Sequence, residues 1–156
     1  MLNNYWLLPN LFILHELEEI LFVPFWKKYN EKKLKDKNLH FFGSLSTFSS
    51  FFLATFEEYI ILILLISICY YLYVPILYLA ILSSYTIHFS IHVRMCLQFK
   101  KYVPGIVTAL IEIPILTVIL YQSWNLLYRE WALYLILVMI VEIIFFMNLK
   151  MLHNYS

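Results

Sequence analysis

Histidine and glutamate side chains interrupt the apolar runs of this sequence in a pattern typical of metal sites. His15, Glu18 and Glu19 lie in "FILHELEEILF", residues 12–22, and their spacing places them on one helical face. His88 and His92 lie in "HFSIH", four residues apart, the spacing at which two imidazoles on a helix can hold one ion. Imidazole and carboxylate groups bind zinc, iron and manganese. We therefore predict a metal site.

The other candidate ligands lie at matching depth. Counted from one end of each apolar run at about 1.5 Å per residue, all candidates fall about 10–16 Å along their helices. We expect one site with one or two divalent ions, Zn or Fe being favoured and Mn being possible in principle. Glu19 and Glu58 are the candidate general bases. The sequence leaves open which member of Glu18/Glu19 and of Glu57/Glu58 ligates. The candidate ligands are His15, Glu18, Glu19, Glu57, Glu58, His88, His92 and Glu112.

Intramembrane carboxylates need compensation. Each acid at a membrane centre costs roughly 2.5–3.5 kcal/mol. Arg94 is the one basic residue within the apolar runs, and it lies near a run's end, so ion pairing cannot offset the acids. Protonation or a bound cation must do so. Glu16 points away from the face of His15, and we expect it to tolerate substitution best. Glu142 has no polar neighbour in its run, so a supporting role and a packing role stay open.

These residues must be positioned by apolar helices. The 156 residues are 63% hydrophobic and 13% charged, whereas soluble domains are about 45–50% apolar and about 25% charged. The composition predicts an all-α, polytopic membrane bundle forming a single domain, residues 1–156. At about 20 residues per span, we expect about five transmembrane helices. Their approximate ranges are 5–26, 51–73, 75–99, 104–121 and 131–149, with a basic cytoplasmic loop at 27–44.

The basic residues predict an orientation. Of the 11 Lys and Arg residues, all but Arg129 fall on one side of the five expected spans. The positive-inside rule then places the N-terminus outside and the C-terminus in the cytoplasm. The lysine-rich loop is interpreted as contacting anionic lipid headgroups rather than nucleic acid. The N-terminal run lacks a basic leader and carries acids, so we expect no cleaved signal peptide. Oligomeric state stays open.

Four motifs together resemble a known family. "HELEE" (residues 15–19), "FEEY" (56–59), "HFSIH" (88–92) and "YVPGIVTALIEIP" (102–114) occur in this order. The chain resembles the small bacterial and archaeal membrane proteins named for an HXXEE motif, a family without an assigned activity. The resemblance implies His15, Glu18 and Glu19 as the motif residues and a bacterial or archaeal cytoplasmic membrane. Intramembrane CAAX-type proteases are a poorer match, because neither acid pair is followed by the arginine of their EExxxR motif.

Three functions suit such a site. The favoured one is a metal-dependent hydrolase acting on a membrane lipid or lipid-like substrate, because a metal activates water and polarises the bond to be cleaved. A di-iron oxidase, hydroxylase or desaturase would use the same carboxylate-rich ligands. A proton or divalent-cation transporter would use them as a relay. The sequence names neither the substrate nor the metal.

Overall fold

The computed structural model describes residues 4–42 and 47–154, and the side chains of Ser50 and of residues 148–154 lie outside that description. The described residues are almost entirely helical and contain no strand, which confirms the all-α prediction. The helices are α1 (Leu7–Asp36), α2 (Phe48–Tyr71), α3 (Pro75–Phe99), α4 (Ile106–Gln122), α5 (Trp124–Arg129) and α6 (Trp131–Asn154).

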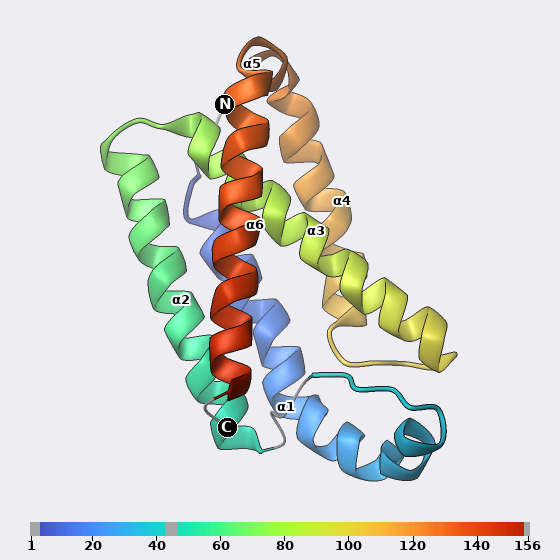
Figure 1. The fold of residues 1–156 in the computed structure, drawn as a ribbon. Coiled ribbons are helices and arrows are strands. Elements are labelled where there is room, and N and C mark those ends of the chain that lie inside the picture. The colour runs from blue at the N-terminus through green and yellow to red at the C-terminus, as the bar shows by residue number, and fades with distance from the viewer. Residues whose placement is uncertain (1–3, 43–46, 155–156) are drawn as a thin grey trace.

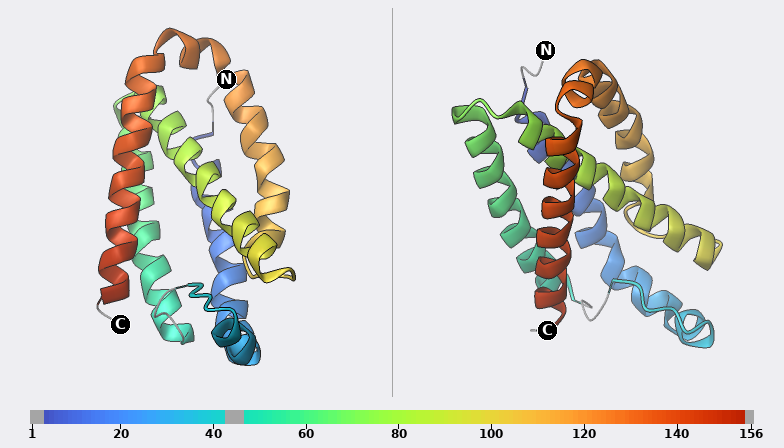
Figure 2. Two further views of the ribbon diagram at one scale, coloured as in Figure 1. Left: turned by 45° about the vertical axis from the view of Figure 1, so that its right-hand side comes forward. Right: turned by 45° about the horizontal axis from the view of Figure 1, so that its top comes forward.

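The five long helices form a bundle (Figure 1). α1, α3 and α6 run down the view of Figure 1, α2 and α4 run up it, and the two ends of the chain lie at opposite ends of the bundle. The short helix α5, which the sequence did not predict, links α4 to α6 (Figure 2). α3 crosses the bundle obliquely and packs chiefly against α6 and α4, while α2 packs against α1.

α3 is the central helix of the hydrophobic core. Pro75 begins it, at a position where a missing N–H costs nothing. Leu79, Leu82 and Phe89 are fully buried along it. Leu8 and Phe12 of α1 join the same hydrophobic cluster. Burial on this scale fixes the rotation of α3, and therefore the direction in which His88 and His92 point.

α1 continues well past the end of the expected first span. Residues 27–36, predicted to be loop, are helical instead. Pro24 lies inside the helix, where its ring removes a backbone hydrogen bond and bends the axis. Figure 1 shows the second half of α1 turned toward the end of α3. The basic sequence here is therefore largely a bent helical extension, and Leu34 is the residue of it that is buried.

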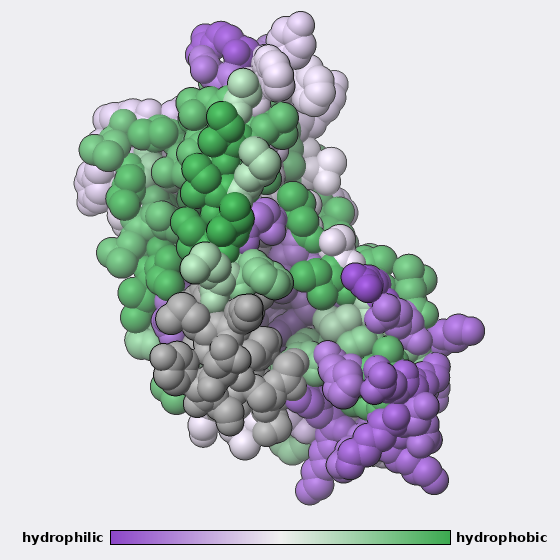
Figure 3. All heavy atoms as spheres, viewed as in Figure 1, coloured by the Kyte–Doolittle hydropathy of each residue, from purple (hydrophilic) through white to green (hydrophobic). Residues whose placement is uncertain are grey.

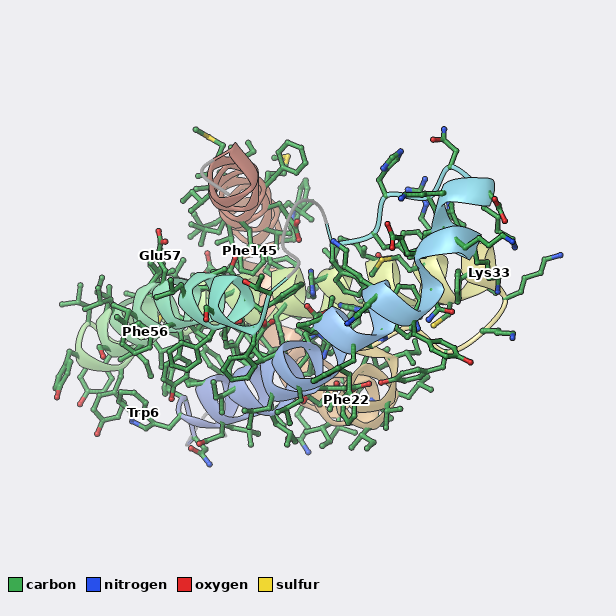
Figure 4. The ribbon with its side chains drawn as sticks, turned by 90° about the horizontal axis from the view of Figure 1, so that it is seen from below. Trp6, Phe22, Lys33, Phe56, Glu57 and Phe145 are labelled. Atoms are coloured by element: carbon green, nitrogen blue, oxygen red, sulfur yellow. The ribbon has the colours of Figure 1, made fainter. Side chains whose placement is uncertain are left out.

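The bent part of α1 is fastened to the end of α3. Lys33 donates a hydrogen bond to the Phe99 carbonyl at 3.0 Å, and its ammonium lies 3.7 Å above the Phe99 ring. Trp26 donates its indole N–H to the Tyr102 carbonyl at 2.9 Å. A cation at a helix C-terminus satisfies free carbonyls and the helix dipole together. Figure 4 labels Lys33 on this extension.

Two described helical segments, Phe51–Tyr71 and Pro75–Phe99, are long and apolar enough to cross a membrane. Apolar stretches of α4 and α6, Ile106–Gln122 and Trp131–Met147, are shorter. Many large apolar side chains of α2, α4 and α6 point outward, among them Leu64, Leu110 and Phe146. Figure 3 shows this hydrophobic surface over α2 and α6 and a hydrophilic end over the extension of α1.

Candidate metal site

Three imidazoles converge at the centre of the bundle. The Nε2 atoms of His15 and His92 lie 3.3 Å apart, and those of His92 and His88 lie 3.1 Å apart. Glu19 Oε1 lies 3.1 Å from His92 Nε2 and 3.8 Å from His15 Nε2. One ligand atom from each of these four residues lies within 4.8 Å of every other. The arrangement therefore unites α1 and α3 around one point.

These separations match those around a tetrahedral ion. A metal held by imidazole at about 2.0–2.1 Å places neighbouring ligand atoms roughly 3.3 Å apart. Three of the four measured contacts, at 3.1–3.3 Å, agree with that edge length. His15 and His92 are fully buried and His88 is half-buried, so His88 is the imidazole nearest to solvent.

The hydrogen bonds of the outer ring nitrogens assign the tautomers. His92 Nδ1 lies 3.1 Å from the carbonyl oxygen of Pro104, which can only accept, so this nitrogen carries the proton. Its Nε2 then presents a lone pair to the cluster. A histidine whose outer N–H is held by a backbone carbonyl is the usual arrangement of a metal ligand.

Thr108 fixes the tautomer of His15, because Glu18 takes the hydroxyl proton of Thr108 in a hydrogen bond. Glu18 Oε2 accepts the Thr108 hydroxyl at 2.7 Å and the Thr108 backbone N–H at 2.9 Å. Because the single hydroxyl proton goes to the carboxylate, Thr108 Oγ1 accepts from His15 Nδ1 at 2.8 Å. His15 Nε2 therefore also presents a lone pair. Two lone pairs facing each other at 3.3 Å repel unless a cation or proton lies between them.

Glu18 thus faces the loop before α4 rather than the imidazoles. Its second oxygen accepts the Tyr102 hydroxyl at 2.8 Å. Partial burial, and then the neighbouring carboxylate, raise the pKa of Tyr102, so this phenol stays neutral and remains a donor. Three donated hydrogen bonds are what an ionised carboxylate accepts. Glu18 therefore contacts the residues around the cluster, whereas Glu19 contacts the imidazoles themselves.

Gly105 allows this close approach. Its φ of +88° lies in the region that favours glycine, and a Cβ here would overlap the His92 imidazole and lie 2.9 Å from Glu19 Oε1. Three residues of the "YVPG" sequence therefore serve the site. Tyr102 donates a hydrogen bond to Glu18, and Pro104 accepts one from His92. Gly105 leaves the space that the His92 imidazole and Glu19 occupy.

The remaining predicted ligands lie outside the four-residue cluster. Glu112 is fully buried and accepts the Tyr85 hydroxyl at 2.8 Å. Glu58 is half-buried and lines an apolar cavity between α1, α2, α3 and α6. Glu57 is exposed, and Figure 4 shows it pointing away from α1. Equal depth fixes the position of a residue along the helix axis but not the direction in which its side chain points. Only some of these side chains therefore point inward.

Glu16 is also buried, contrary to its expected tolerance. It accepts the Thr55 hydroxyl at 2.9 Å in the contact between α1 and α2. Removing one partner of a buried hydrogen bond leaves the other unsatisfied. Glu142 on α6 interacts with Ser84 of α3, and its Oε1 atom is buried.

The cluster is accessible from a cleft of about 540 Å³, here called the polar cleft. Glu19, His88 and His92 form part of its wall, together with Arg94 and Gln98. Figure 3 shows hydrophilic atoms in a recess between α6 and the basic end of the molecule. The cleft gives a small molecule or a lipid headgroup a path to the ligand atoms.

A family description, "protein of unknown function with HXXEE motif", matches residues 6–119. The match covers most of the chain. The chain belongs to the HXXEE family. No curated protein and no solved structure matched this chain.

The His and the two Glu residues of the HXXEE motif all contact the candidate site, in different ways. His15 faces the cluster, Glu18 holds Thr108, and Glu19 faces the imidazoles. Thr108 and Tyr102 are site residues that the sequence reasoning missed. Thr108 lies four residues before Glu112, on the same helical face, and that spacing was the available signal.

Proposed function

We propose that this HXXEE protein is an intramembrane metal-dependent hydrolase that acts on a lipid or lipid-like substrate. The observation that carries the proposal is the convergence of three imidazole Nε2 atoms and one carboxylate oxygen at the wall of an open cleft. Ligands whose outer nitrogens are already engaged are oriented for a cation before it arrives.

We assign His15, His88 and His92 to one ion, with zinc first and iron or manganese as alternatives. Three protein ligands and an open position are usual for a catalytic zinc. The four-residue cluster contains a single carboxylate, which favours one ion over the dinuclear carboxylate sites of other bundles. A bound divalent ion would lower the pKa of a water and polarise the bond to be cleaved.

Glu19 is the proposed general base. It takes a proton from the water as the water oxygen bonds to the substrate's carbonyl carbon or phosphorus. The bond to the leaving alkoxide then breaks, and Glu19 returns the proton to that oxygen. Glu18 keeps His15 aligned through Thr108 and does not itself meet the substrate.

We further propose that the protein crosses the membrane five times, through α1, α2, α3, α4 and α6, with its N-terminus outside. The opposite placement of the two chain ends and the hydrophilic surface over the extension of α1 support this orientation. The shorter apolar stretch of α4 is compatible with a locally thinned bilayer or with neighbouring helices that shield its ends. The metal site then lies in the cytoplasmic half.

The decisive experiment follows oxygen from labelled water. Protein loaded with zinc or with iron is incubated with mixed phospholipid vesicles in ¹⁸O-water, and products are analysed by mass spectrometry. Hydrolysis predicts one ¹⁸O in the released acid or phosphate, absent with His88→Ala and retained with Glu130→Gln, a partly exposed acid far along the chain. An oxygenated product without ¹⁸O, formed with iron alone, would instead identify an oxidase. No product with any metal would overturn the proposal.

A further inference from the structure

The wall of the metal site is one part of a longer face of α3. Leu77, Ile81, Ser84 and Tyr85 of this helix line the apolar cavity. Ile91, His92, Met95 and Gln98, farther along the helix, line the polar cleft. His88 lies between the two groups, three to four residues from each, so all lie along one side of the helix. The face therefore passes from apolar, through the metal ligands, to polar.

The apolar cavity has the character of an acyl-chain site. Its volume is about 130 Å³, and aliphatic side chains of α1, α2, α3 and α6 form most of its wall. An apolar protein cavity of about 150 Å³ stays dry and binds a six-carbon ring. Phe145 lines the cavity, and its ring centroid lies 6.1 Å from that of His88. Tyr85 also lines the cavity, and its ring centroid lies 6.1 Å from that of His15, so aromatic rings lie between the cavity and the cluster.

A buried hydroxyl lies at the cavity wall. Ser84 Oγ is buried and interacts with the Glu142 carboxyl of α6. Its hydroxyl has one proton to donate, so a bound carbonyl there would compete with Glu142 for it. Ser84 lies one helical turn before His88, so a substrate carbonyl next to the cleaved bond would reach it.

The polar cleft favours an anionic group. Arg94 lines it and forms no ion pair with a carboxylate within residues 4–42 and 47–154. A guanidinium with free donors binds phosphate or carboxylate in a bidentate fashion. Gln98, one turn beyond Arg94, adds a neutral donor on the same wall. Glu19, the acid of the same wall, lies at the imidazoles, so Arg94 is the charged group left to contact a phosphate.

We propose that this face of α3 binds a single-chain lipid with an anionic headgroup, its chain in the apolar cavity and its headgroup beside Arg94. The cleavable bond then lies at His88. This inference rests on the proposed function for its chemistry, but the binding mode is testable without turnover. A cavity of this size suits part of one chain rather than two.

The test uses dodecyl phosphate with a photoreactive diazirine at the chain end, added to zinc-loaded and to metal-free protein in nanodiscs of zwitterionic lipid. Crosslinked residues are mapped by mass spectrometry. We expect labels on the cavity-lining residues of α3 and α6, among them Ile81 and Leu137. Labels confined to the outward residues of α4, such as Leu110, would overturn the proposal, because they report only bilayer contact.

Two variants separate the head and chain contacts. Arg94→Gln is expected to lower cavity labelling at least tenfold, whereas Lys101→Gln, which removes the same charge outside the cleft, changes it less than twofold. Ile81→Trp, which fills the cavity, should abolish labelling there, and Leu137→Phe serves if the first variant does not fold. Equal losses for Arg94→Gln and Lys101→Gln would contradict a specific head site.

Failure here is distinguishable from failure of the proposed function. Zinc content and ¹⁸O incorporation are measured on the same preparations. Turnover without cavity labelling contradicts the proposed binding mode but supports the proposed hydrolase function. Cavity labelling with no ¹⁸O incorporation by the metal-loaded protein supports the lipid site and contradicts the hydrolase.

Discussion

Glu18 and Glu19 are neighbours in sequence but have different partners. Glu18 accepts hydrogen bonds from Thr108 and Tyr102, and Glu19 lies beside the imidazoles. Helical spacing predicted that both share a face with His15, but adjacent residues differ by about 100° around a helix. Which one faces the imidazoles depends on the rotation of α1 against α4, and packing between helices sets that rotation. The sequence alone could not supply it.

Thr108→Val should weaken metal binding. The change keeps the shape of the side chain but removes the hydroxyl that joins His15 to Glu18. Loss of such an outer partner typically lowers metal affinity about 10–100-fold. Competition with a chelator of known affinity measures the change. Thr108→Ser should retain wild-type affinity, and equal affinity for the valine variant would refute this role.

Glu19→Gln should separate binding from chemistry. Three imidazoles remain, so we expect metal content close to that of the wild type, while loss of the base lowers turnover about 10²–10⁴-fold. Metal content by mass spectrometry and initial rates on one preparation give both numbers. Loss of the ion would show instead that Glu19 is a ligand.

Gly105→Ala should disrupt the site through backbone geometry. The added Cβ would overlap the His92 imidazole, and the positive φ disfavours alanine. We expect a lower melting temperature in detergent and little stabilisation on adding zinc. Ala132→Gly, a change of the same size on α6, serves as the control. A zinc-dependent stabilisation equal to the wild type would show that the backbone there can move.

At the scale of helices, hydrophobic length predicted α3 accurately and α2 and α4 to within a few residues. Hydrophobic length missed the continuation of α1 through residues 27–36, because this lysine-rich segment is not apolar and does not resemble part of a transmembrane helix. It also missed α5, whose six residues are too short for periodicity. Depth counting grouped Glu57 with the site although its side chain is exposed, since depth contains no angular information.

The contact between the extension of α1 and α3 depends on Lys33. Lys33→Met removes its hydrogen bond to the Phe99 carbonyl and its position above the Phe99 ring. We expect a lower melting temperature in detergent than for Lys35→Met, which breaks only an exposed pair with Glu31. Equal melting temperatures for the two variants would show that the contact of Lys33 with Phe99 does not stabilise the packing of the α1 extension against α3.

The face of the molecule in Figure 3 combines a hydrophobic surface over α2 and α6 with a hydrophilic end over the lysine-rich extension of α1. Charge asymmetry in the sequence predicts the orientation because translocation disfavours lysine-rich segments. Single cysteines introduced at Asn125 and at Lys32, after replacement of Cys69 and Cys96, should react with a membrane-impermeant maleimide from opposite sides. In intact cells we expect Asn125 to be labelled and Lys32 to be protected until lysis. Labelling of both positions in intact cells would contradict the five-span orientation.

Metal content tests most directly our proposal that His15, His88 and His92 hold a divalent ion. Protein purified in mild detergent without added metal, then analysed by inductively coupled plasma mass spectrometry, should contain close to one zinc, iron or manganese per chain. The double variant His15→Ala/His88→Ala should contain less than a tenth of that, while remaining monodisperse. Equal metal in both proteins, or none in the wild type even after loading, would contradict the account.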